Sequence, residues 1–187
     1  MLVVIGLLYP EPSSTLPGMR SLALLLFLFA ALTDWLDGWL ARRFGQVSEF
    51  GKFMDALADK VLTMGMFVSL LALGALEKWT LFLILMILSR EFIITGLRLV
   101  TAAKGKTLAA EKVGKIKTVV QLLSISLILG QLSLEADGDR FLDVEVNTQV
   151  TEVLRWAGQL SLIFGSVLTV VSGIIYLTKY WKYFLDE

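Results

Sequence analysis

Long apolar runs dominate this chain, and several approach the roughly 20 residues that an α-helix needs to cross a bilayer. These runs cover about residues 19–43, 51–75, 79–102, 113–134 and 153–178. Charged residues make up only 18% of the chain, whereas a soluble domain carries about a quarter. The mean hydropathy is +0.74. We therefore expect an all-α polytopic membrane protein that forms a single domain over residues 1–187.

The first residues do not make a complete span. Residues 1–9 are apolar but too short to cross a bilayer, and residues 10–18 contain three prolines and a glycine, which predict a loop. We interpret residues 1–9 as the end of a first transmembrane helix whose beginning is absent.

Loop charges predict how the chain sits in the membrane. Segments 42–52 and 98–117 and the tail after residue 178 are basic. They alternate with a turn at residues 77–78 and with a polar loop predicted at 135–152, which has six acidic residues. The positive-inside rule places the three basic segments in the cytoplasm. The formal net charge is zero, so no overall field favours a nucleic-acid partner.

Four aspartates interrupt the apolar sequence at helical spacing, namely Asp34 and Asp37 in one predicted span and Asp55 and Asp59 in the next. Each pair falls on one helix face, and a short link lets antiparallel neighbours bring both pairs to the same depth. Converging carboxylates in apolar surroundings need a compensating charge. The chain has no His and no Cys, so carboxylates favour hard cations such as Mg²⁺ or Mn²⁺. Two such ions about 4 Å apart form a clamp for phosphoryl chemistry.

The residues around the aspartates help to choose between a metal site and its alternatives. Gly38 and Ala41 lie near the first pair and leave the backbone open to a substrate, and Arg42 follows at a position suited to a phosphate. Intramembrane carboxylates also serve as a proton relay or an ion path in a cation transporter, and a single glycine such as Gly51 often only packs helices. The combined spacing favours the metal site.

This stretch resembles the signature of the CDP-alcohol phosphotransferase family, D-x2-D-G-x2-A-R-x8-G-x3-D-x3-D. Every fixed position is met, by Asp34, Asp37, Gly38, Ala41, Arg42, Gly51, Asp55 and Asp59. The resemblance implies a bundle of six transmembrane helices, usually a homodimer, with its active site open to the cytoplasm. It also implies a CDP-linked donor, an alcohol acceptor, two divalent metal ions and CMP as the leaving product.

The same resemblance assigns roles to the matching residues. The metal ligands it implies are Asp34, Asp37, Asp55 and Asp59, and Asp59 is also the implied general base for the acceptor hydroxyl. The implied CDP pocket consists of Gly38, Ala41, Arg42 and Gly51.

Two further stretches, residues 89–98 and 114–121, resemble the phosphatidylglycerophosphate synthases of this family, whose donor is CDP-diacylglycerol and whose acceptor is glycerol 3-phosphate. Four basic residues there suit a phosphate dianion, namely Arg90, Arg98, Lys115 and Lys117. Two alternatives stay open: cytoplasmic loops are basic for topological reasons alone, and Arg90 and Glu91 can pair with polar groups inside the bundle. Another acceptor also stays open, either inositol phosphate, serine, or phosphatidylglycerol in cardiolipin synthesis.

One departure from the family lies at the start of the chain. These synthases usually begin with an interfacial segment of the type Pro-Asn-x-Leu-Thr-x-x-Arg, which this sequence lacks. The absence of extra domains and of a targeting sequence leads us to expect a bacterial cell membrane.

Overall fold

A computed structural model describes the backbone of residues 1–9, 17–44, 49–103 and 112–180. It describes their side chains except at 35, 38, 39, 41–44, 49–56, 59, 102, 103 and 112–115. Every regular element in these residues is helical: α1 (Leu2–Leu8), α2 (Met19–Phe44), α3 (Glu49–Ala72), α4 (Thr80–Ala103), α5 (Lys112–Asp137), the short 3₁₀ helix η1 (Gly138–Arg140) and α6 (Val144–Tyr180). The all-α prediction is confirmed.

Three helices of the described chain are long and apolar enough to cross a membrane. They lie at Thr80–Thr101, Ile116–Arg140 and Val144–Tyr180. Helix α6 has 37 residues, which at 1.5 Å per residue gives about 55 Å. The hydrocarbon core of a bilayer is about 30 Å thick, so α6 is considerably longer than that core is thick. The expected membrane protein is confirmed at this level, while the number of spans stays a prediction.

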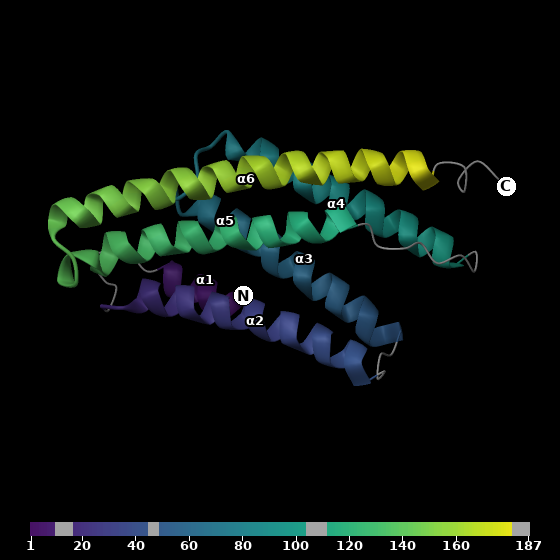
Figure 1. The fold of residues 1–187 in the computed structure, drawn as a ribbon, viewed down its shortest axis with the longest axis horizontal. Coiled ribbons are helices and arrows are strands. Elements are labelled where there is room, and N and C mark those ends of the chain that lie inside the picture. The colour runs from purple at the N-terminus through teal and green to yellow at the C-terminus, as the bar shows by residue number, and fades with distance from the viewer. Residues whose placement is uncertain (10–16, 45–48, 104–111, 181–187) are drawn as a thin grey trace.

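The helices are arranged around α5, which contacts α2, α3 and α6, while α4 contacts α3 and α6, and α1 packs on α2. Figure 1 shows that α2, α4 and α6 end, and α3 and α5 begin, toward the same end of the molecule. We call this the motif end, because the chain passes there from α2 to α3. The opposite end, where α3 turns into α4 and α5 into α6, is the far end. The helix ends that adjoin the three basic segments of the sequence therefore all lie at the motif end.

One apolar cluster joins side chains from α1 to α6. Its largest fully buried members include Phe27, Phe67, Ile84, Ile125 and Leu162. Each comes from a different helix, so burying them holds the helices around a common centre.

Small residues let α5 and α6 approach closely. A Cβ added at Gly158 would lie 2.7 Å from Cγ1 of Ile128, so this position has no room for a larger residue without movement. The backbone oxygen of Gly158 also accepts a hydrogen bond of 2.8 Å from the Ser124 hydroxyl. Close packing at small residues, with a hydroxyl bond across the interface, is typical of helix pairs in membranes.

The turn between α3 and α4 confirms the turn predicted at residues 77–78. Gly74 has a positive φ of 74°, which favours glycine at the end of a helix. Its amide donates to Leu71 O and the next amide to Leu70 O, the two bonds of a Schellman motif. The Thr80 hydroxyl then donates to Glu77 O at 2.7 Å where α4 begins.

The polar loop predicted at residues 135–152 is too long, because only residues 138–143 lie between the two long helices. Helix α5 continues to Asp137, and α6 begins at Val144. The Asn147 amide donates to Asp139 Oδ1 at 2.7 Å and to Leu134 O at 3.3 Å, so polar side chains tie the two helix ends together. Glu145 lies in the first turn of α6, where a negative charge stabilises the helix. Low hydropathy there coincides with helix, so polarity alone does not predict a loop.

Candidate active site

The four signature aspartates lie at matched positions on α2 and α3. Asp34 and Asp37 precede the last residue of α2 by ten and seven residues, and Asp55 and Asp59 follow the first residue of α3 by six and ten. At 1.5 Å per residue these separations are about 15 Å and 10 Å in both helices. The helix bounds therefore give both pairs similar distances from the linked ends of their helices, which fits a site shared between them.

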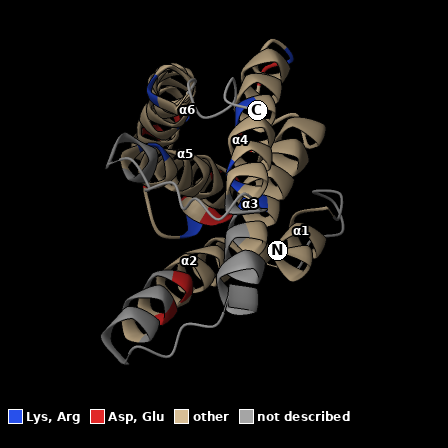
Figure 2. Cartoon of the chain, turned by 90° about the vertical axis from the view of Figure 1, so that its right-hand side faces the viewer, with Lys and Arg blue, Asp and Glu red and all other residues tan. Residues whose placement is uncertain are grey.

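The structure describes only part of this site. The side chains of Asp34 and Asp37 are exposed, and Figure 2 shows acidic residues near the end of α2. The other signature side chains lie outside the described ones: Gly38, Ala41, Arg42, Gly51, Asp55 and Asp59. Within the described residues no three His, Cys, Asp or Glu side chains come together as a metal site. Convergence of the four carboxylates stays a prediction, and the exposure of the first pair fits it.

A buried charge network joins α4, α5 and α6. Arg90 Nη1 lies 3.0 Å from Glu91 Oε1, and the ammonium of Lys117 pairs with the same oxygen. Arg90 Nη2 also donates to the Ser172 hydroxyl at 3.0 Å. Pairing of Arg90 and Glu91 with polar groups inside the bundle, which the sequence left open, is confirmed. Two cations share one carboxylate, so the three side chains carry one net positive charge.

Arg98 occupies a different environment from Arg90. It is exposed, and its Nε donates to the Tyr176 hydroxyl at 3.3 Å. Its guanidinium also lies 5.4 Å from the centre of the Tyr176 ring, within the range of a cation–π interaction. These contacts orient Arg98 and leave part of its guanidinium accessible. The side chain of Lys115 lies outside the described residues.

The sequence did not predict a buried polar stripe on α6, formed by Ser166, Thr169, Ser172 and Tyr176. The Thr169 hydroxyl accepts a bond of 3.1 Å from Gln121 Nε2, and Ser172 and Tyr176 contact the two arginines described above. Polar residues that recur every three or four positions in an apolar helix predict such a stripe, and this signal was present in the sequence.

An apolar groove of about 420 Å³ lies between α4 and α6. Its walls include Leu85, Ile93 and Ile174, and Arg90 lies at its edge. A Cβ added at Gly173 would lie 2.9 Å from Cγ of Arg90, so the arginine side chain packs directly on this glycine. The groove brings hydrocarbon surface next to the buried charge network.

Comparison with known proteins decides the family. The sequence model of the CDP-alcohol phosphatidyltransferase family matches residues 1–175. The chain belongs to this family. Members of the family generally use divalent metal ions.

Several bacterial relatives are similar over most of the chain. One from Bacillus subtilis (strain 168) is 38% identical over 159 residues, which cover 84% of this chain and 72% of the relative. One from Rickettsia felis is 32% identical over 165 residues, covering 88% of this chain and 82% of the relative. One from Cereibacter sphaeroides is 30% identical over 88% of this chain and 84% of the relative. All three are named CDP-diacylglycerol–glycerol-3-phosphate 3-phosphatidyltransferase.

Proposed function

We propose that this chain transfers the phosphatidyl group of CDP-diacylglycerol to glycerol 3-phosphate, giving phosphatidylglycerophosphate and CMP. The observation that carries the reaction type is the complete family signature on two linked helices, at matched distances from their linked ends. The choice of acceptor is supported by the three relatives named CDP-diacylglycerol–glycerol-3-phosphate 3-phosphatidyltransferase, which are 30% to 38% identical to this chain. Membership of the family argues against a cation transporter.

Four carboxylates would hold two divalent cations, Mg²⁺ or Mn²⁺, namely those of Asp34, Asp37, Asp55 and Asp59. The exposure of the first pair supports this assignment, because these carboxylates remain accessible to a ligand. Oxygen ligands alone also fit the preference of hard cations. When bound, such ions stabilise negative charge on the diphosphate and on the departing CMP.

Asp59 is the proposed general base. It accepts the proton of the acceptor hydroxyl as that oxygen forms a bond to the phosphorus that carries the lipid. The bond from this phosphorus to the CMP oxygen breaks, and CMP leaves with the electron pair. The carboxylate needs to accept a proton only as the new bond forms, so a weak base suffices.

The rest of the signature would bind the nucleotide. Gly38, Ala41 and Gly51 have little or no side chain, which leaves room for CDP against the helix backbones. Arg42 offers a planar guanidinium that can bind a phosphate through two parallel hydrogen bonds.

Acceptor binding is assigned to Arg98 and Lys115, with weaker roles for Arg90 and Lys117. Arg98 is supported by its exposure and by its contacts with Tyr176, which hold it at the motif end of α4. Arg90 and Lys117 already share Glu91, so only one net charge of that network is left for the glycerol phosphate dianion. We further propose a homodimer in a bacterial cell membrane, with the motif end facing the cytoplasm.

A panel of acceptors tests the function directly. Purified protein receives CDP-diacylglycerol and Mg²⁺ with glycerol 3-phosphate, inositol phosphate, serine or phosphatidylglycerol, and CMP release is measured. We expect release with glycerol 3-phosphate alone, loss of release with a chelator, and recovery when Mg²⁺ or Mn²⁺ is added back. Release with a different acceptor contradicts the acceptor assignment, and release that survives chelation contradicts the metal assignment.

A further inference from the structure

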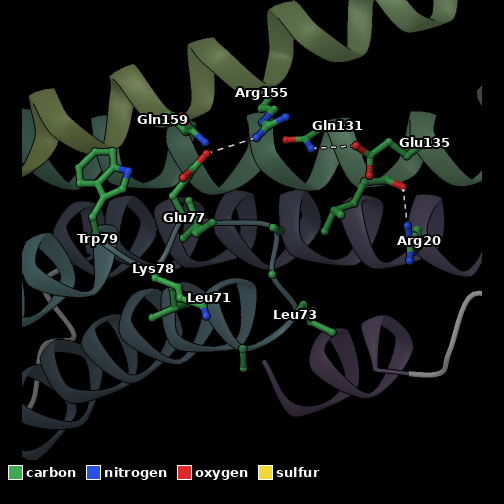
Figure 3. A pocket seen from close by; sticks show the side chains of 15 residues that line it. Arg20, Leu71, Leu73, Glu77, Lys78, Trp79, Gln131, Glu135, Arg155 and Gln159 are labelled. Carbon is green, nitrogen blue, oxygen red and sulfur yellow. Dashed lines mark hydrogen bonds and ion pairs between the residues drawn. The ribbon is translucent and has the colours of Figure 1, made fainter.

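A cavity of about 830 Å³ lies at the far end of the bundle, beside the turn between α3 and α4. Figure 3 shows side chains that line it. It is lined by residues 71–79 of the turn between α3 and α4, by Arg20 of α2, and by residues of α5 and α6. The lining residues of α5 and α6 are Gln131, Leu132, Glu135, Arg155 and Gln159. Its volume falls within the roughly 300–1,000 Å³ of ligand pockets.

Gln131 offers this cavity an unused hydrogen-bond acceptor. The side chain is 5% exposed and lines the cavity, and its Oε1 has no hydrogen-bond partner among the described residues. Its Nε2 donates to Glu135 Oε1 at 3.0 Å. Because a carboxylate accepts hydrogen bonds, this contact fixes the amide nitrogen toward Glu135 and turns the oxygen the other way. A ligand that donates a hydroxyl or amine proton therefore suits the position.

The charged lining favours an anion with a single charge. Three cations and two carboxylates line the cavity, which leaves one positive charge. Arg155 and Glu77 pair with each other at 3.3 Å. Arg20 makes one long contact of 3.5 Å with Leu132 O among the described residues, and a guanidinium has five N–H donors. Arg20 therefore keeps donors for an anionic ligand.

The lining of the cavity also combines an interfacial aromatic residue with an apolar wall. Trp79, half exposed, lines it at the start of α4, and tryptophan is enriched at the membrane interface. Leu71, Leu73 and Leu76 give the same cavity an apolar wall. A ligand with one phosphodiester charge, free hydroxyl groups and attached hydrocarbon matches all of these features.

We propose that the far-end cavity binds the head group of an anionic glycerophospholipid with free hydroxyl groups. The phosphodiester contacts Arg20, and a head-group hydroxyl donates to Oε1 of Gln131. This site is separate from the proposed active site at the motif end, and it does not depend on the reaction proposed above.

Binding to the full chain in detergent tests this site, with short-chain phosphatidylglycerol as the probe and titration calorimetry as the measurement. Short-chain phosphatidylcholine has a zwitterionic head group without hydroxyls, and glycerophosphoglycerol is the same anionic head group without hydrocarbon. The variants are Arg20→Ala, Arg20→Lys and Gln131→Met. Arg140→Gln is the matched control, because Arg140 is an exposed cation of the far end that does not line the cavity. Any binding at the motif end contributes equally to all of these proteins.

We expect phosphatidylglycerol to bind at least tenfold more tightly than either comparison ligand. Arg20→Ala and Gln131→Met each weaken this binding about tenfold, Arg20→Lys weakens it less, and Arg140→Gln leaves it within twofold. If phosphatidylcholine binds as tightly as phosphatidylglycerol, the proposal is overturned. If glycerophosphoglycerol binds as tightly as phosphatidylglycerol, the site binds a free head group and not a lipid. An effect of Arg140→Gln equal to that of Arg20→Ala also overturns it. If Gln131→Met does not fold, the two Arg20 variants carry the test. CMP release is measured separately, so failure of the proposed reaction leaves this result unaffected.

Discussion

One charge cluster in each half of the bundle shows how differently ion pairs in this molecule are buried. Toward the motif end, Arg90, Glu91 and Lys117 are largely buried, and Glu91 pairs with Arg90 on its own helix and with Lys117 on α5. At the far end, Glu77 and Arg155 form an ion pair in which each side chain is 48% exposed. The buried network joins α4, α5 and α6, whereas the Glu77–Arg155 pair at the far end stays accessible to solvent.

This contrast matters energetically. Removing one partner from a buried ion pair leaves a charge without compensation and costs about 3–5 kcal/mol, while an exposed pair contributes about 0–1 kcal/mol. We therefore expect substitutions of charged residues toward the motif end to lower CMP release or stability. We expect substitution of Glu77 at the far end to lower neither by much. Three substitutions, each with a matched control, test this difference.

The largest effect is expected for Asp59→Asn. The change removes a proposed metal ligand and the proposed base together, so CMP release should fall by at least about a hundredfold. Glu77→Gln removes a carboxylate at the far end and is the matched control, with release expected to stay within twofold. Full CMP release from Asp59→Asn would show that the base assignment is wrong. Equal losses in both variants would remove the distinction between the two ends.

The second effect, on stability rather than on rate, is expected for Glu91→Gln. This change leaves Arg90 and Lys117 buried without their shared carboxylate, so the free energy of unfolding should fall by about 3–5 kcal/mol. Glu77→Gln breaks the exposed pair with Arg155 and should cost no more than about 1 kcal/mol. Denaturant titration of both variants in the same detergent, followed by circular dichroism, measures the two values. Similar costs for the two substitutions contradict the contrast between buried and exposed pairs.

The helices at the motif end were largely predictable from the sequence, and the proposed chemistry there imposes fixed spacing. The proposed metal ligation would need Asp34 and Asp37 on one helix face and Asp55 and Asp59 on another, and such spacing is visible in a single chain. The helix bounds near the signature were also predicted closely, since apolar runs mark them. The lining of the far-end cavity comes from four segments that are separated in the sequence, so no local sequence pattern predicts the cavity.

Two features that the sequence did not predict, the helix over residues 144–152 and the polar stripe on α6, have a common physical cause. The helix over residues 144–152 was predicted as loop because its polar residues lack a membrane pattern, although Asn147 ties it to Asp139 and Leu134. The bond from Gln121 to Thr169 depends on how α5 packs on α6. In both cases the partner is brought close only by the assembled bundle, so hydropathy alone does not predict the contact.

The smallest effect compares two glycines, each within a long helix. Gly173 of α6 packs on the buried network, and a Cβ there would lie 2.9 Å from Cγ of Arg90. Gly130 of α5 lies toward the far end, and its Cβ would lie 3.6 Å from Cδ1 of Leu154, an ordinary contact. Gly173→Ala should therefore cost about 1–3 kcal/mol through overpacking, whereas Gly130→Ala should gain up to about 1 kcal/mol from helix propensity.

The same denaturant titration distinguishes the two alanine variants. Alanine favours the helix at both positions, so opposite signs can arise only from the space around each Cβ. A stabilising Gly173→Ala would mean that Arg90 moves aside at no cost, and the motif half would then be less tightly packed than the far end. A destabilising Gly130→Ala would mean that the far half of the α5–α6 interface tolerates as little change as the half beside the proposed active site.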